Sequence, residues 1–178
     1  MTSATRNRVV GLAIAVLVFV ADQFTKWLMV EPLQLRQRGH IDLLPFFDLT
    51  WTENRGISLG LFSADTSQAR WMLVGVTGLI AAVIVVWMLR EKLLGDIAAL
   101  ALVLGGAVGN ITDRFLYGYV VDFADFHIGT WRPFLIFNLA DAAITVGVLI
   151  LLVRALFMRE TREPRHGAGQ ADNPAETL

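Results

Sequence analysis

The stretch WMLVGVTGLIAAVIVVWML, residues 71–89, contains no charged residue. About 20 apolar residues are enough to cross the hydrocarbon core of a bilayer as a helix, so this stretch predicts a membrane span. Three further apolar segments accompany it, at Val9–Val30, Ile97–Tyr117 and Leu135–Val153. We therefore predict an all-α membrane protein with four transmembrane helices.

The composition is typical of the same class. The chain has 178 residues, of which 55% are hydrophobic and 17% are charged, and its formal net charge is −1. This composition is too apolar for an ordinary soluble domain, and the small net charge gives no indication of a nucleic-acid partner. The chain has no cysteine, which excludes disulfides, thiolate metal sites and a cysteine nucleophile.

The first apolar segment could also be a secretory signal peptide, because Arg6 and Arg8 precede it. It is longer than the usual apolar region of such a peptide, and VADQFTKW (20–27) is a poor cleavage site. We therefore predict that it is a retained span.

An even number of spans places both termini on one side of the membrane. Basic residues are slightly more frequent on that side, so the positive-inside rule predicts cytoplasmic termini. The basic residues on the terminal side are Arg6, Arg8, Arg90, Lys92, Arg154, Arg159, Arg162 and Arg165. Lys26 and Arg114 lie inside apolar segments beside acids, which favours a role in a site over a role in topology.

The segment 31–70 then lies outside the cytoplasm. Its part HIDLLPFFDLTWTENRG (40–56) contains β-formers punctuated by Pro45 and Gly56, which predicts short strands with turns. ADTSQAR (64–70) predicts a short surface helix. We expect residues 1–158 to form a single domain and the polar tail 159–178 to be disordered. Gly105 and Gly109 form a GxxxG pair, which indicates close helix packing.

Polar residues interrupt the apolar segments at one depth. In a bundle of four alternating spans, the late parts of the first and third spans and the early part of the fourth all reach the outer leaflet. The residues there are Asp22, Lys26, Asn110, Asp113, Arg114, Asn138 and Asp141, and Asn54 and the short loop that contains Asp122 are on the same side. Asp22 and Lys26 are four residues apart, so they share one helix face. The pairs Asn110–Asp113 and Asn138–Asp141 are three residues apart and share a face in the same way. The pattern therefore predicts one polar cluster at the outer end of the bundle.

Most of these residues have a simple structural explanation, since ion pairs and amides commonly join membrane helices. Asp141 differs, because no basic residue lies three or four positions away from it. An intramembrane carboxylate without such a partner is a functional hypothesis by default. Its possible acidic partners include Asp113, and Asp122 is by itself indistinguishable from Asp125 in YVVDFADF (119–126).

Other catalytic motifs give weak signals. The sequence has no HExxH and no phosphate-binding glycine loop, and His40, His127 and His166 are scattered, so we expect no metal or cofactor. Ser58, in GISLG (56–60), could serve as a nucleophile, but the nearest lysine candidate is Lys26 and nothing in the sequence fixes that geometry. Acids inside membrane helices could also belong to a proton-coupled transporter or channel, or to a non-enzymatic scaffold. The absence of repeats and the one-sided acids disfavour a transporter, and the unpaired Asp141 disfavours a scaffold.

Five sequence blocks carry a resemblance to a known family. They are DQFTKW (22–27), TENRG (52–56), GNITDR (109–114), VVDF (120–123) and FNLAD (137–141). In this order the blocks resemble lipoprotein signal peptidase, also called signal peptidase II, a family of bacterial intramembrane aspartic proteases. The resemblance covers roughly residues 9–158. It departs at NRGISLG (54–60), where Ser58 and Leu59 replace the small residue and the aromatic of a family pattern closer to N-x-G-x-A-F.

The resemblance implies four membrane helices with a small extracytoplasmic β-cradle and a short surface helix, in the bacterial inner membrane with both termini cytoplasmic. It implies an aspartic endopeptidase that removes the signal peptide from a diacylglyceryl-modified prolipoprotein, just before the lipid-modified cysteine. The implied partners are that prolipoprotein and membrane lipids, with no nucleic acid, and we expect a monomer. The implied catalytic pair is Asp122 and Asp141. The implied supporting or substrate-binding residues are Asn54, Gly56, Asn110, Arg114, Asn138, Asp22, Lys26 and Asp113.

Two close carboxylates suit peptide hydrolysis without a metal or a nucleophile. One carboxylate activates water and the other polarises the carbonyl, and the pair shares one proton because both cannot ionise at short distance. Asp113 has Arg114 beside it, whereas Asp122 has no basic residue within four positions. We therefore expect Asp113 to be a structural anchor and Asp122 to be the partner of Asp141.

Overall fold

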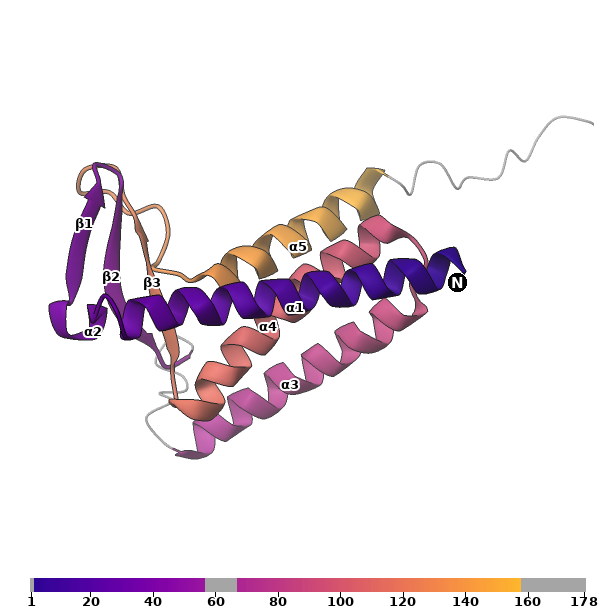
Figure 1. The fold of residues 1–178 in the computed structure, drawn as a ribbon, viewed down its shortest axis with the longest axis horizontal. Helices are drawn as coiled ribbons and strands as arrows, with labels where there is room; N and C mark the ends of the chain where they lie inside the picture. Colours follow the sequence, from indigo (N-terminus) through magenta and orange to yellow (C-terminus); the bar gives the residue numbers. More distant parts are fainter. Residues whose placement is uncertain (1, 57–66, 158–178) are drawn as a thin grey trace, which may run out of the picture.

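The computed structural model describes residues 2–56 and 67–157. These residues contain four long helices, α1 (Ser3–Val30), α3 (Ser67–Arg90), α4 (Leu94–Leu116) and α5 (Leu139–Phe157). All four are long and apolar enough to cross a membrane. They form a bundle that carries a small sheet at one end, and the N-terminus and the end of α5 lie at the opposite end (Figure 1). The prediction of four membrane helices is confirmed.

Helix α4 is the central helix of the bundle. Within its apolar window 50% of the residues are buried, against 22%, 17% and 11% for α1, α3 and α5. Small residues let its neighbours approach: a Cβ added at Gly105 would lie 2.6 Å from the carbonyl oxygen of Ala15, and one at Gly109 would collide with the carboxylate of Asp22. The GxxxG pair therefore has the predicted packing role.

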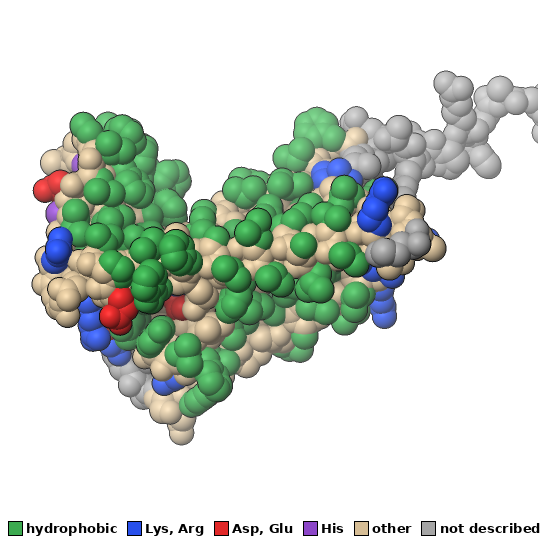
Figure 2. Space-filling model, in the orientation of Figure 1, with side chains coloured by type: hydrophobic (Ala, Val, Ile, Leu, Met, Phe, Trp, Pro, Cys, Tyr) green, Lys and Arg blue, Asp and Glu red, His purple; other side chains and the backbone are tan. Residues whose placement is uncertain are grey.

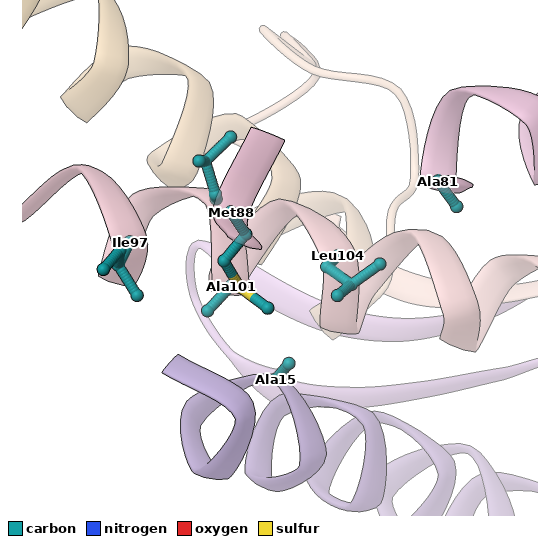
Figure 3. Close-up of a cluster of buried hydrophobic side chains, with 7 residues drawn as sticks. Ala15, Ala81, Met88, Ile97, Ala101 and Leu104 are labelled. Atoms are coloured by element: carbon teal, nitrogen blue, oxygen red, sulfur yellow. The ribbon is translucent and has the colours of Figure 1, made fainter. Parts of the chain in front are cut away.

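An apolar cluster joins α1, α3 and α4 inside the bundle (Figure 3). Its buried members are Ala15, Ala81, Met88, Ile97, Leu100, Ala101 and Leu104. Many large apolar side chains remain exposed on the outer faces of the helices, where Figure 2 shows them in green along the bundle. Such an extended apolar surface fits a lipid environment. Lys and Arg side chains gather at the end of the bundle that holds the N-terminus (Figure 2).

The sheet consists of three antiparallel strands in the order β1 (His40–Leu44), β2 (Phe47–Asn54) and β3 (Val120–Phe126). Strands β1 and β2 occupy the predicted strand region. The expectation that Asp122 lies in a loop is wrong, because it lies in β3, opposite Thr52 of β2. The β-forming residues Val121 and Phe123 alternate with Asp122, and their apolar side chains join the buried cluster between the sheet and α1.

The short helix outside the bundle does not lie where the sequence predicted it. The predicted surface helix over 64–70 lies partly outside the described residues, and its residues 67–70 form the first turn of α3. A different short helix, α2 (Leu35–Arg38), joins α1 to β1, and its Leu35 is fully buried under the sheet. The tail 159–178 and the family departure at Ser58 and Leu59 lie outside the described residues.

Candidate active site

The predicted polar cluster lies at the end of the bundle nearest the sheet. Its buried members come from α1, α4, β3 and the residue before α5: Asp22, Lys26, Asn110, Asp113, Asp122 and Asn138. Asp141, in the first turn of α5, is partly buried beside them. Burying polar groups is costly unless they are paired and hydrogen-bonded, so the partners of each group determine what the cluster can do.

Lys26 is the cationic centre of the cluster. Its Nζ lies 2.8 Å from Oδ2 of Asp22 and 2.9 Å from Oδ2 of Asp113, and the three side chains are at most 5% exposed. The predicted Asp22–Lys26 pair is thus present. The ion-pair partner of Asp113 is this lysine from another helix rather than the adjacent Arg114. Sequence reasoning missed Gln23, which donates to both acids and whose only signal was its polarity inside an apolar span.

The two acids of this ion cluster also bind backbone amides. Oδ1 of Asp22 accepts from the amide of Ala140 at 3.0 Å, in the first turn of α5, where the helix dipole favours negative charge. Oδ2 of Asp113 accepts from the amide of Val121 at 3.1 Å. Each of these amides belongs to the residue directly before one of the two candidate catalytic acids. The ion cluster therefore fixes the backbone beside both of them.

A capping box holds Asp141 at the start of α5. The amide of Asp141 donates to Oδ1 of Asn138 at 2.9 Å, and the amide of Asn138 donates to Oδ2 of Asp141 at 3.2 Å. Nδ2 of Asn110 donates to the other carboxylate oxygen at 2.8 Å. Asp141 is therefore positioned by its own helix start and by one amide from α4.

The hydrogen bonds determine the orientation of both asparagine amides. Oδ1 of Asn110 accepts from Lys26 Nζ and from Asn138 Nδ2, each at 3.1 Å, so its Nδ2 is directed to Asp141. Asn138 uses Oδ1 for the helix cap and donates through Nδ2 to Oδ1 of Asp122 at 2.6 Å. Asn138 therefore binds both candidate catalytic acids.

Asp122 is 1% exposed, and this burial changes its acidity. Its pKa is raised from 3.8 to about 7, chiefly by burial and then by the negative charge of Asp141, while hydrogen bonds from Asn54 and Asn138 act in the opposite direction. A carboxyl group with this pKa carries its proton at mildly acidic pH and can donate it. Such perturbed groups are concentrated at functional sites.

Asp125, three residues further along β3, has a different environment. Burial acts to raise its pKa, but hydrogen bonds from Arg132 and Thr50 lower the pKa overall. The Nε of Arg132 lies 2.9 Å from its Oδ1. The strand places Asp125 on the opposite face from Asp122, because residues three apart point to opposite sides. The structure thus distinguishes two acids that the sequence pattern could not separate.

A cavity of about 650 Å³ lies beside Asp122. Its walls are residues 52–56 of β2 and the turn after it, and residues 132–136 of the segment that leads to α5. The predicted residues Asn54 and Gly56 both line it, and the amide of Gly56, at φ 99°, donates to Oδ1 of Asn54 at 3.0 Å. Sequence reasoning missed the wall formed by 132–136, which has no polar motif apart from Arg132.

Arg114 is half-buried at the edge of the cluster. Its charge interacts with those of Asp141, Asp122 and Asp113, yet its Nε has no hydrogen-bond partner within the part of the chain that the structure describes. The structure therefore brings every predicted site residue to one region. Two acids linked through one asparagine, next to a cavity, can in principle activate water and protonate a carbonyl oxygen.

Comparisons of the sequence with known proteins point to one family. The sequence profile of the family described as signal peptidase (SPase) II matches residues 14–157. Among curated proteins, the chain is 56% identical to the lipoprotein signal peptidase of Sphingopyxis alaskensis over 91% of this chain and 90% of the relative. It is 55% identical to that of Rhizorhabdus wittichii, over 89% and 92% of the two chains.

Solved structures of known proteins share this fold. A structure described as a bacterial membrane enzyme superposes with a TM-score of 0.74 at 28% identity, over 89% of this chain and 94% of the other. A second structure with the same description superposes with a TM-score of 0.72 at 30% identity, over 83% and 93%. The bundle with its small sheet is therefore an architecture already observed in membrane enzymes.

Proposed function

The chain belongs to the signal peptidase II family of aspartic peptidases, which remove signal peptides from prolipoproteins, and from this premise we propose that Asp122 and Asp141 are its two reacting carboxylates. The observation that carries the proposal is that Asn138 donates hydrogen bonds to both acids. The raised pKa of Asp122, caused by burial and by the charge of Asp141, supports it because a proton-sharing pair needs one acid that keeps its proton.

In the proposed reaction, Asp141 accepts a proton from water while the resulting hydroxide adds to the carbonyl carbon of the scissile peptide bond. Asp122 donates its proton to the carbonyl oxygen, which gives a neutral tetrahedral intermediate. When this intermediate collapses, the leaving amine nitrogen takes the proton from Asp141, the C–N bond breaks, and a proton returns to Asp122. Asn110 and Asn138 position the two carboxylates, and the buried cation of Lys26 holds Asn110 in its orientation.

We propose that the site lies at the outer leaflet and that both termini are cytoplasmic. In support, the sheet lies at the end of the bundle opposite the N-terminus and the end of α5 (Figure 1), and the polar cluster lies beside the sheet. The cavity wall contains Phe134 and Leu135, which are 63% and 84% exposed. Such apolar groups beside Asp122 suit a substrate with an apolar signal peptide and a diacylglyceryl group. We further propose that one chain forms the complete site, because both carboxylates receive their positioning hydrogen bonds from Asn110 and Asn138 of the same chain.

The assignment of Asp122 and Asp141 as the catalytic dyad is tested by the variants Asp122→Asn and Asp141→Asn. The matched control is Asp125→Asn, which lies on the same strand as Asp122. Each purified variant is given a diacylglyceryl-modified precursor in detergent, and the new N-terminus is identified by mass spectrometry. We expect both dyad variants to lose turnover by several orders of magnitude, because each removes an acid–base group, and the control to cleave before the lipid-modified cysteine. Near-normal cleavage by either dyad variant would show that the assignment is wrong.

The orientation is tested separately with reporters. A fusion after Leu178 should show cytoplasmic behaviour, and a tag inserted next to Arg38 should react with reagents that cannot cross the membrane. The reverse pattern would place the polar cluster at the inner leaflet and contradict the proposed route of the substrate.

A further inference from the structure

A second polar cluster lies on the sheet, at the end away from Asp122. It consists of His40 and Asp42 on β1, Asp48 on β2 and His127 directly after β3. In the strand register Asp42 is opposite Asp48, and Asp48 is opposite Asp125, two residues before His127. Alternation along the strands therefore places these side chains on one face. Asp48 lies four residues from Thr52, the partner of Asp122, which is roughly 13 Å along the strand.

The ligand atoms of this cluster lie close together. One ligand atom each of His40, Asp42 and Asp48 lies within 4.8 Å of the others. Nε2 of His40 is 3.0 Å from Oδ1 of Asp42 and 3.5 Å from Oδ2 of Asp48, and Nε2 of His127 is 2.7 Å from that same Oδ2. Zinc–ligand bonds of about 2.0–2.2 Å separate tetrahedral ligands by about 3.4 Å. The observed spacings are close to this value. We propose that this cluster binds a divalent transition-metal ion, with Zn²⁺ as its representative.

The hydrogen bonds behind the histidines determine which ring nitrogen faces the cluster. The hydroxyl of Thr50 donates to Asp125, so its oxygen accepts from Nδ1 of His40 at 2.8 Å. Nδ1 of His127 lies 3.2 Å from the carbonyl oxygen of Gly129, which can only accept. Both rings therefore carry a proton on Nδ1 and direct Nε2 towards the carboxylates, the arrangement that commonly orients metal-binding histidines.

In a neutral imidazole, an Nε2 of this kind presents a lone pair. Nε2 of His127 is buried and has no hydrogen-bond partner within the described residues, although Oδ2 of Asp48 is near. A lone pair against a carboxylate oxygen is unfavourable, because both are acceptors. A bound cation makes both atoms ligands and removes the conflict. The alternative is that the rings are protonated, which makes the cluster a set of ion pairs without a metal.

The surroundings of the cluster also fit an ion site. The carboxylate of Asp48 is 8% exposed, whereas that of Asp42 is 92% exposed, so an ion has both a buried ligand and a route from solvent. A cavity of about 390 Å³ adjoins it and is lined by Asp42, Asp48 and His127 together with the tip between β1 and β2. Histidine and acidic side chains lie next to each other on this end of the sheet (Figure 2). Two imidazoles favour zinc and its neighbours over calcium or magnesium.

The test uses the full chain, purified without a polyhistidine tag and stripped with EDTA. Isothermal titration with ZnCl₂ in detergent should give saturable binding of one ion per chain. His40→Ala and Asp42→Asn, both at exposed positions, should weaken binding at least tenfold. The matched control is His166→Ala, which removes the remaining histidine of the chain and should leave the affinity unchanged. X-ray absorption at the zinc edge should show nitrogen and oxygen ligands near 2.0–2.2 Å.

Three results would overturn the proposal: no saturable binding at pH 7.5, wild-type affinity in His40→Ala, or loss of binding in His166→Ala. The unfolding temperature without zinc shows whether each variant is folded, and zinc should raise it in the wild type but not in His40→Ala. If zinc does not bind, the cluster is a set of ion pairs without a metal. The stripped enzyme should retain its turnover, which separates this proposal from the assignment of the dyad.

Discussion

Asp122→Asn should make the protein inactive and, at alkaline pH, more stable. The fold holds the pKa of Asp122 at about 7, against 3.8 for an exposed carboxyl, because the group is buried and lies near the charge of Asp141. The native state therefore binds more protons than the unfolded state between these two pH values, and stability falls as pH rises across that window. Asparagine has a similar shape and cannot ionise, so the variant avoids this cost.

The size of the effect follows from the same values. At about 1.4 kcal/mol for each pH unit, moving the pKa from 3.8 to about 7 corresponds to about 4 kcal/mol above pH 7 and to nothing below pH 4. Asn138 can still donate to the amide oxygen of the new residue, so little of the gain should be lost. We expect the variant to be more stable than the wild type by up to about 4 kcal/mol at pH 8.

The assay is unfolding in detergent at several values between pH 5 and pH 8, for the wild type, Asp122→Asn and Asp125→Asn. The control should show no such pH dependence. Despite its burial, the pKa of Asp125 is lowered from 3.8 by Arg132 and Thr50, so its ionised form adds stability throughout pH 5–8 that is lost only as pH falls below 3.8. Asp125→Asn should therefore be less stable than the wild type by the same amount across the assayed range. Parallel pH curves for the wild type and Asp122→Asn, or a less stable Asp122→Asn at pH 8, would refute the reasoning.

Three other predictions concern the same site. Asp113→Asn should lower stability by about 1–3 kcal/mol, because it removes one of the two buried partners of Lys26 while Asp22 still neutralises the lysine. It should retain turnover per folded molecule. Thermal unfolding and cleavage assays measured together check this, and an inactive but stable variant would make Asp113 the partner of Asp141. Turnover should fall as pH rises through about 7, because the protonated form of Asp122 is needed, and a pH–rate profile that is flat from pH 5 to pH 9 would contradict this. EDTA and serine- or thiol-directed reagents should leave cleavage intact, and a loss with EDTA that zinc restores would argue against the aspartic mechanism.

Much of the fold follows from local patterns. Uninterrupted apolar runs such as 71–89 determine membrane helices without tertiary information, because a bilayer requires length and hydrophobicity in one continuous segment. Helical spacing predicted the pair of Asp22 and Lys26, since residues four apart share a helix face. The one-sided placement of the polar residues follows from the alternating directions of the spans.

Other features arise from contacts between distant segments. The strand that carries Asp122 needs β2 as its partner, about 70 residues earlier, and YVVDFADF cannot specify this partner by itself. Asp113 finds its partner in Lys26, on another helix, although Arg114 is its neighbour in the sequence. A pairing of this kind depends on which faces of two helices meet.

The sequence by itself determined the membrane class and the spans, and its resemblance to a family supplied the prediction that Asp122 and Asp141 form the catalytic pair. Only the tertiary structure decided the environment of each acid: Asp122 faces Asn138 and is buried without a salt bridge among the described residues, while Asp125 faces Arg132. The sequence also does not show that His40 and His127 meet, because they are far apart along the chain. The pairing of β1 and β3 with β2 brings both histidines to the carboxylate of Asp48. The physical reason is that burial and charge act through space, whereas a sequence pattern records only neighbours along the chain.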